Sequence, residues 1–88
     1  MYLKNPEYFL TIVKERSISR AAEKLYLSQP YLSQYLAKLE SNLGVTLLDR
    51  SRSPLQLTQA GALFQASVAV VDQLFIDLDT LTRDGTTE

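Results

Sequence analysis

The stretch Ser19–Gly44, SRAAEKLYLSQPYLSQYLAKLESNLG, has the pattern of two short helices joined by a tight turn. Ser19 is the expected N-cap of the first helix, because a serine oxygen accepts a backbone N–H that has no partner within the helix. Pro30 comes directly after the turn, and a proline suits the first turn of a helix because its missing N–H is not needed there. Gly44 is expected to adopt the left-handed conformation that ends the second helix. This order of signals predicts a helix-turn-helix.

The second helix, residues 30–43, has two contrasting faces. Four leucines spaced 4, 3 and 4 residues apart form an apolar face: Leu32, Leu36, Leu39 and Leu43. The opposite face and its flanks are small and polar, with a single charge: Pro30, Tyr31, Ser33, Gln34, Ala37, Lys38 and Ser41. Amide and hydroxyl groups can donate to and accept from base edges in DNA. A polar face alone is weak evidence, since any solvated helix has one, but this face holds fewer Lys and Glu residues than is usual.

The residues after Gly44 have the pattern of a short β-hairpin. Residues 45–50 and 55–58 favour strands, and the turn residues 51–54 separate them. A hairpin directly after a recognition helix is a wing, from which Arg50 and Arg52 would reach the DNA backbone or the minor groove. The alternative is that both arginines are simply solvated in a polar turn.

A helix is also predicted before the helix-turn-helix, beginning at Asn5-Pro6-Glu7. Its apolar stripe contains Phe9, Ile12 and Val13. The tyrosines near helix ends are expected to be packing residues rather than binding groups: Tyr2, Tyr8 and Tyr26. The sequence therefore predicts a mostly α fold: a winged helix-turn-helix of three helices plus a two-stranded β wing, followed by a long helix.

The long helix is predicted from Thr58, its expected N-cap, to Leu81. Gly61 in its first turn costs about 1 kcal/mol of helix propensity against alanine, which suggests close packing against a neighbour. The small and apolar positions repeat with heptad spacing: Ala60, Phe64, Ser67, Val71, Leu74, Leu78 and Leu81. One interpretation is that this stripe only covers the core. However, about 24 residues span about 36 Å, longer than so small a domain, so we expect the outer half to pair with a second copy.

This pattern divides the chain into a DNA-binding domain at 1–58, a linker helix for dimerisation at 59–82 and a flexible tail at 83–88. The expected dimer contacts are Phe64, Val71, Leu74, Leu78 and Leu81.

Charge and composition narrow the classes of function. Residues 1–59 hold eight basic and five acidic side chains, a net charge of +3, whereas residues 60–88 carry a net charge of −4. Attraction to phosphate is therefore confined to the first two-thirds of the chain. Histidine and cysteine are absent, which makes an enzyme, a cofactor site or a metal site improbable and suits a reducing cytoplasm. We also expect no membrane-spanning segment.

The sequence resembles the N-terminal domain of the LysR-type transcriptional regulators over about residues 3–80. The resemblance is carried by three runs: Ile18-Ser19-Arg20-Ala21-Ala22-Glu23-Lys24-Leu25 through Ser28-Gln29-Pro30, Leu39-Glu40 through Leu43-Gly44, and Leu57-Thr58-Gln59-Ala60-Gly61. It implies a homodimer that binds inverted-repeat operator half-sites on double-stranded DNA. It also implies that Gln29, Pro30, Ser33 and Gln34 face the major groove. Because family members usually continue into an effector domain, we expect this chain to be a DNA-binding fragment.

Three positions depart from the family pattern: Tyr31 replaces a small residue, Gln34-Tyr35 replaces a pair that is often Arg-Gln, and Arg52 lies one place earlier than expected. These differences concern the operator sequence rather than DNA binding. The predicted DNA-binding residues are Arg20, Ser28, Gln29, Pro30, Tyr31, Ser33, Gln34, Lys38, Arg50 and Arg52. A second hypothesis is a winged-helix protein–protein module that uses the apolar long helix, which the acidic second half of the chain favours.

Overall fold

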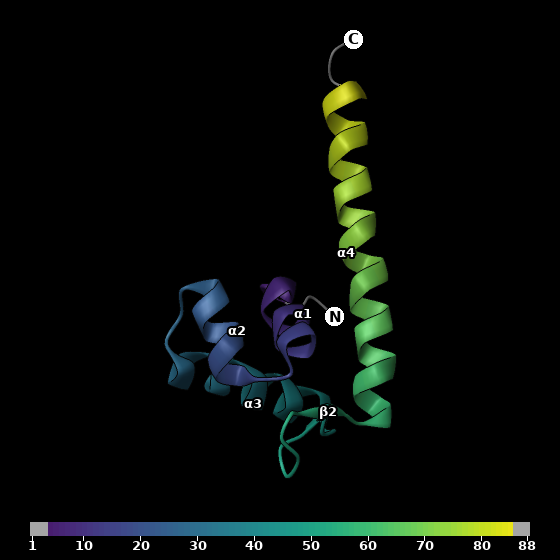
Figure 1. Ribbon diagram of the computed structural model, residues 1–88. Helices are drawn as coiled ribbons and strands as arrows, with labels where there is room; N and C mark the ends of the chain where they lie inside the picture. Colours follow the sequence, from purple (N-terminus) through teal and green to yellow (C-terminus); the bar gives the residue numbers. More distant parts are fainter. Residues whose placement is uncertain (1–3, 86–88) are drawn as a thin grey trace.

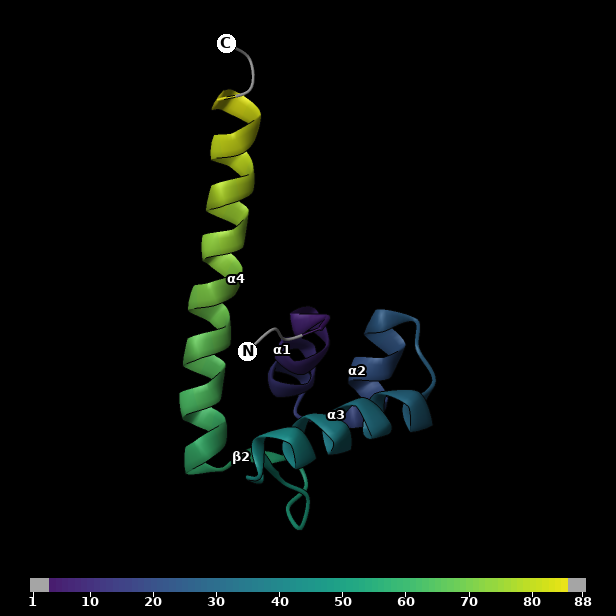
Figure 2. The same cartoon turned by 180° about the vertical axis from the view of Figure 1, so that it is seen from behind.

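The computed structural model describes residues 4–85, apart from the side chains of residues 72, 75 and 82–85. The elements in chain order are α1 (Pro6–Glu15), α2 (Ile18–Leu25), α3 (Gln29–Leu43), β1 (Leu48–Asp49), β2 (Gln56–Leu57) and α4 (Gln59–Gly85). Helix α3 crosses beneath α1 and α2, and the hairpin lies below α3 (Figures 1 and 2). Helix α4 runs beside α1 and extends well beyond it. The predicted winged helix-turn-helix with a following long helix is confirmed.

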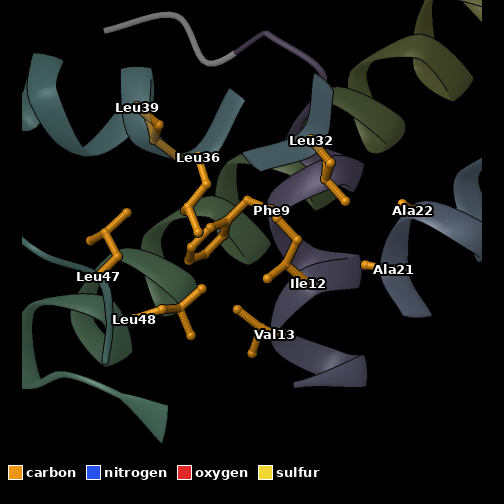
Figure 3. Close-up of a cluster of buried hydrophobic side chains, with 10 residues drawn as sticks. All are labelled: Phe9, Ile12, Val13, Ala21, Ala22, Leu32, Leu36, Leu39, Leu47 and Leu48. Atoms are coloured by element: carbon orange, nitrogen blue, oxygen red, sulfur yellow. The ribbon is translucent and has the colours of Figure 1, made fainter. Parts of the chain in front are cut away.

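The core lies where α1, α2 and α3 meet and is closed below by the strand region (Figure 3). Its ten buried side chains come from the three helices and from the strand region: Phe9, Ile12, Val13, Ala21, Ala22, Leu32, Leu36, Leu39, Leu47 and Leu48. Three of the four leucines predicted on the apolar face of α3 are buried, and Leu43 packs partly buried at the edge of the core. The opposite face of α3 is thereby turned to solvent.

The cap of α2 differs from the prediction. Helix α2 begins at Ile18, and its N-cap is Ser17, whose Oγ accepts the backbone N–H of Arg20 at 3.2 Å. Ser19 lies inside the first turn, where its Oγ pairs with that of Ser17 at 3.1 Å. The helix begins earlier because it includes Ile18, which packs against the core. At the start of α1, Asn5 precedes Pro6 as expected but makes no side-chain capping bond.

The hairpin is shorter than the predicted strands. Leu48 pairs with Leu57 and Asp49 with Gln56 in an antiparallel ladder. The Asp49 carboxylate accepts the backbone N–H and the hydroxyl of Ser51, at 3.0 and 2.6 Å, and so closes the turn. These hydrogen bonds, together with the Arg52 guanidinium, lower the pKa of the Asp49 carboxyl.

The start of α4 confirms two sequence predictions. Thr58 Oγ1 accepts the backbone N–H of Gly61 at 2.9 Å, as an N-cap does. A Cβ on Gly61 would lie 2.0 Å from the carbonyl oxygen of Leu47, so only glycine fits this close contact. The helix continues to Gly85, so residues 83–85 are helical rather than part of a tail; residues 86–88 lie outside the described residues.

One further expectation needs correction. Tyr26 is not a packing residue: its side chain is 95% exposed at the left-handed C-cap of α2. Tyr8 packs against the core, whereas Tyr2 lies outside the described residues.

The segment Gln59–Leu81 is long and apolar enough to span a membrane by length and composition, with a mean hydropathy of 1.4. This is weak evidence for a membrane, because an apolar helix that packs on other protein passes the same test.

Candidate nucleic-acid interface

The exposed face of α3 begins at a capped N-terminus. Ser28 Oγ accepts the backbone N–H of Tyr31 at 3.2 Å, and Pro30 lies in the first turn. The serine hydroxyl therefore has a structural role, while its proton stays available to an acceptor such as a phosphate oxygen. Gln29, Pro30, Gln34 and Lys38 are all exposed, and Ser33 is half-buried on the flank. The structure thus presents the predicted groove-facing residues to solvent on one surface.

Two tyrosines on α3 have different surroundings. The Tyr35 hydroxyl lies 3.0 Å from the carbonyl oxygens of both Lys4 and Asn5, and its ring meets that of Tyr8 edge to face at a centroid distance of 5.2 Å. Burial, followed by the charge of Glu7, raises the pKa of Tyr35 to about 12. Tyr35 is therefore a packing residue.

Tyr31, by contrast, is 52% exposed and touches Tyr8 only at a centroid distance of 6.5 Å. Its ring is supported on one side and open on the other.

An open concavity of about 320 Å³ lies between the N-terminal ends of α2 and α3 and the hairpin. Three arginines and several hydrogen-bonding side chains line it: Arg16, Ser17, Ser19, Gln29, Arg50, Arg52 and Ser53, with Ile18 and Leu55 as apolar neighbours. The N-cap and the first residues of α2, Ser17, Ile18 and Ser19, line this concavity, and a helix N-terminus favours an anion. The concavity therefore combines the features expected of a phosphate contact.

The hairpin arginines are held by carboxylates. Arg50 Nη1 lies 3.0 Å from Glu40 Oε1, and Arg52 Nε lies 3.5 Å from Asp49 Oδ2. Arg52 is the more exposed, with 68% of its side chain accessible against 42% for Arg50. Arg52 can exchange its weak surface pair for a phosphate, whereas Arg50 has a structural partner that the sequence did not predict.

Four polar residues that line this concavity were not among the predicted DNA-binding residues: Arg16, Ser17, Ser19 and Ser53. Ser19 was expected only as an N-cap. Arg16 and Ser17 had the pattern of a polar helix exit. The Arg16 carbonyl accepts the backbone N–H of Leu55 at 3.0 Å, which brings the end of α1 next to the hairpin. No local signal reveals this contact, because it joins residues 39 positions apart. The predicted residue Arg20 lies nearby, exposed in the first turns of α2.

The apolar face of α4 is only partly free. Phe64, predicted to contact a second subunit, is partly buried against the core and meets Phe9 edge to face at a centroid distance of 5.2 Å. Val71, Leu74, Leu78 and Leu81 are 47–66% exposed. Leu63 and Val70, each 68% exposed, lie along the same face and were left out of the predicted dimer contacts.

The comparisons with known proteins agree with this architecture. Residues 3–62 match the model of the family described as bacterial regulatory helix-turn-helix protein, lysR family. The probable cat1 operon transcriptional activator of Acinetobacter lwoffii is 45% identical over 64 residues, which are 73% of this chain and 21% of that protein. CatR of Pseudomonas putida is 39% identical over 85 residues, 97% of this chain and 29% of CatR. The chain thus spans between a fifth and a third of the length of these relatives.

Solved structures extend the likeness to the long helix. The DNA-binding domain of BenM in complex with catB site 1 DNA superposes with a TM-score of 0.91 and 31% identity, over 100% of this chain and 99% of that one. The DNA complex of the CbnR DNA-binding domain gives a TM-score of 0.89 and 29% identity, over 98% and 99%. This chain belongs to the lysR family of bacterial regulatory helix-turn-helix proteins.

Proposed function

We propose that this chain is the sequence-specific DNA-binding part of a bacterial transcriptional regulator and acts as a homodimer in the cytoplasm, without enzymatic activity. The observation that carries the proposal is the exposed polar face of α3, which adjoins the concavity lined by three arginines. Gln29, Ser33 and Gln34 read base edges in the major groove, and the hairpin lies over the adjoining minor groove. The BenM and CbnR domains were solved on DNA with the same fold, which supports this assignment.

Backbone contacts set the register. Arg16, Arg20, Lys38 and Arg52 neutralise phosphates. The hydroxyl of Ser28 and one hydroxyl of the hydrogen-bonded pair Ser17–Ser19 donate to phosphate oxygens. Tyr31 adds contact with a sugar or a thymine methyl group beside α3. Two copies pair through Leu63, Val70, Val71, Leu74, Leu78 and Leu81 of α4, which places two recognition helices on an inverted repeat.

The first test separates base readout from phosphate attraction. Gln29→Ala should relax base preference at one position, at a cost of about 1–3 kcal/mol for a lost bidentate contact. Arg52→Ala should weaken binding to all sequences and reduce the salt slope by about one. Lys24→Ala is the matched control for Arg52, because Lys24 is also exposed and also pairs weakly, at 3.9 Å, with an acid, Glu15.

The assignment of roles is wrong if the Gln29 and Arg52 variants lose specific and non-specific binding equally. The alternative, a protein–protein module, is favoured by the exposed apolar face of α4. Sedimentation of the chain alone and with duplex DNA, at low and raised salt, distinguishes the two. A dimer indifferent to every duplex would support the module, whereas a dimer that binds DNA and releases it as salt rises supports the regulator.

A further inference from the structure

Glu40 is an acid with an unusual set of partners near the C-terminal end of α3. Only 12% of its side chain is accessible. Its Oε2 accepts the backbone N–H groups of Leu47 and Leu48, at 2.7 and 3.2 Å, and its Oε1 accepts from Arg50 at 3.0 Å. One carboxylate therefore fixes the chain that enters the hairpin to the recognition helix, through charge-assisted bonds of the stronger kind.

The carbonyl groups of the same short segment bind the residue that precedes α4. The Leu47 carbonyl accepts the backbone N–H of Thr58 at 3.0 Å, and the Thr46 carbonyl accepts the Thr58 hydroxyl. Thr58 in turn caps α4 through Gly61, whose Cα lies directly against the Leu47 carbonyl. The segment Thr46–Leu48 is thus bonded to α3 through its amides and to α4 through its carbonyls.

These residues form one rigid connection, which we name the α3–α4 junction: Glu40, Thr46–Leu48, Thr58 and Gly61. The segment between the two helices is thus hydrogen-bonded to the end of α3 and to the start of α4. A change in the orientation of α4 relative to α3 would strain these bonds and the glycine contact.

A small rotation at the junction would produce a large displacement at the far end of α3. Gln29, at the reading end of α3, lies 11 residues from Glu40, or about 16 Å along the helix. A rotation of about 12° at the junction would displace Gln29 by about 3.4 Å, which is one base-pair step. In a dimer joined through α4, the angle between α3 and α4 therefore decides which separation of half-sites both recognition helices can reach.

We propose that the α3–α4 junction, with Glu40 at its centre, determines half-site spacing: its residues touch no DNA but position the two recognition helices of the dimer. This inference rests on the proposed function. Glu40 and Thr58 are positioning residues, and the base preference within each half-site is independent of them.

The test measures spacing and base preference separately, with the full chain and a library of inverted half-sites whose spacer varies one base pair at a time. The first variant is Glu40→Gln, which keeps the size of the side chain and removes its charge. The second is Thr58→Val, which removes the two hydrogen bonds of the threonine hydroxyl, to the Thr46 carbonyl and from the Gly61 N–H. Glu23→Gln, exposed on α2, is the charge-matched control, and Thr58→Ser restores the cap and the bond to Thr46. Sedimentation verifies that each variant is still a dimer.

The expected result is that Glu40→Gln and Thr58→Val broaden or shift the preferred spacer by about one base pair, while the preferred bases within each half-site stay those of the wild type. Thr58→Ser and Glu23→Gln should keep the wild-type spacing. If the two variants lose stability but keep the wild-type spacing profile, the junction only stabilises the fold and the inference is overturned. It is likewise overturned if the wild-type dimer binds DNA with no spacing preference. A wild type that binds no duplex at all instead refutes the proposed function.

Discussion

The two ends of helix α4 carry the same kind of apolar pattern in different surroundings. At the first end, Gly61 and Val68 are buried against the winged domain and Phe64 packs on Phe9. At the far end, Leu74 and Leu81 are 52% and 66% exposed. This end of α4 extends beyond α1 (Figures 1 and 2). A heptad pattern therefore shows which face of a helix is apolar but not what covers it. Changes at the first end should reduce the stability of the domain, and changes at the far end should weaken the dimer.

The largest effect is expected for Gly61→Ala. Its Cβ would lie 2.0 Å from a backbone oxygen, that of Leu47, so the start of α4 must move. We expect the free energy of unfolding to fall by about 3 kcal/mol or more, although alanine favours the helix by about 1 kcal/mol. Urea unfolding followed by circular dichroism measures this change.

The control is Ala62→Gly, next to Gly61 and exposed, which should cost only about 1 kcal/mol in helix propensity. A Gly61→Ala variant as stable as the wild type would show that α4 is not held tightly against Leu47.

The next effect is expected for Phe64→Ala. The ring is partly buried against Phe9, so its loss should lower the free energy of unfolding by about 2–3 kcal/mol, less than for a fully buried phenylalanine. The comparison requires both urea unfolding and sedimentation, the second to follow the dimer. If Phe64→Ala dissociates the dimer and leaves stability unchanged, then Phe64 faces the second subunit after all.

Leu74→Ala should have the opposite signature. A half-exposed leucine that becomes covered in the dimer contributes about 1 kcal/mol per chain, so its loss from both chains should raise the dimer dissociation constant roughly 30-fold. Domain stability should change little. Ile76→Ala is the matched control, because Ile76 is similarly exposed, at 51%, but lies on the opposite side of α4. Equal effects of the two variants would argue against the proposed dimer face.

The smallest effect, inside the winged domain, is expected for Tyr35→Phe. It removes the hydroxyl that bonds the carbonyls of Lys4 and Asn5, at a cost of about 1 kcal/mol. The pKa of Tyr35 is raised to about 12 from an ordinary value of 10.0, so the unfolded chain loses this proton first. Wild-type stability should therefore fall as pH rises from about 10 to about 12.

Tyr35→Phe should remove part of that alkaline decline, and chemical denaturation at pH 9 and pH 11.5 measures the difference. The other tyrosines are common to the wild type and the variant, so the difference between the two pH profiles of stability reports on Tyr35 alone. Identical pH profiles would mean that this hydroxyl is solvated in the folded state.

Local signals predicted much of the fold. The leucine spacing of α3, the proline in its first turn and Gly44, observed at φ 75°, depend only on residues near in sequence. The same holds for the Thr58 cap and for the exposed polar face of α3, because helical periodicity fixes which side chains share a face. The Ser17 cap, the exposed Tyr26 and the extension of α4 to Gly85 were not predicted, because packing and not propensity sets such boundaries.

The sequence by itself determined the family, the helix-turn-helix and the polar reading face, since periodic patterns and caps are properties of neighbouring residues. Only the tertiary structure decided that Phe64 packs against the core, that Arg50 pairs with Glu40 and that Arg16 adjoins the wing. The physical reason is the same in each case. A burial, an ion pair or a shared concavity joins residues far apart in the chain, and their meeting depends on how the helices pack.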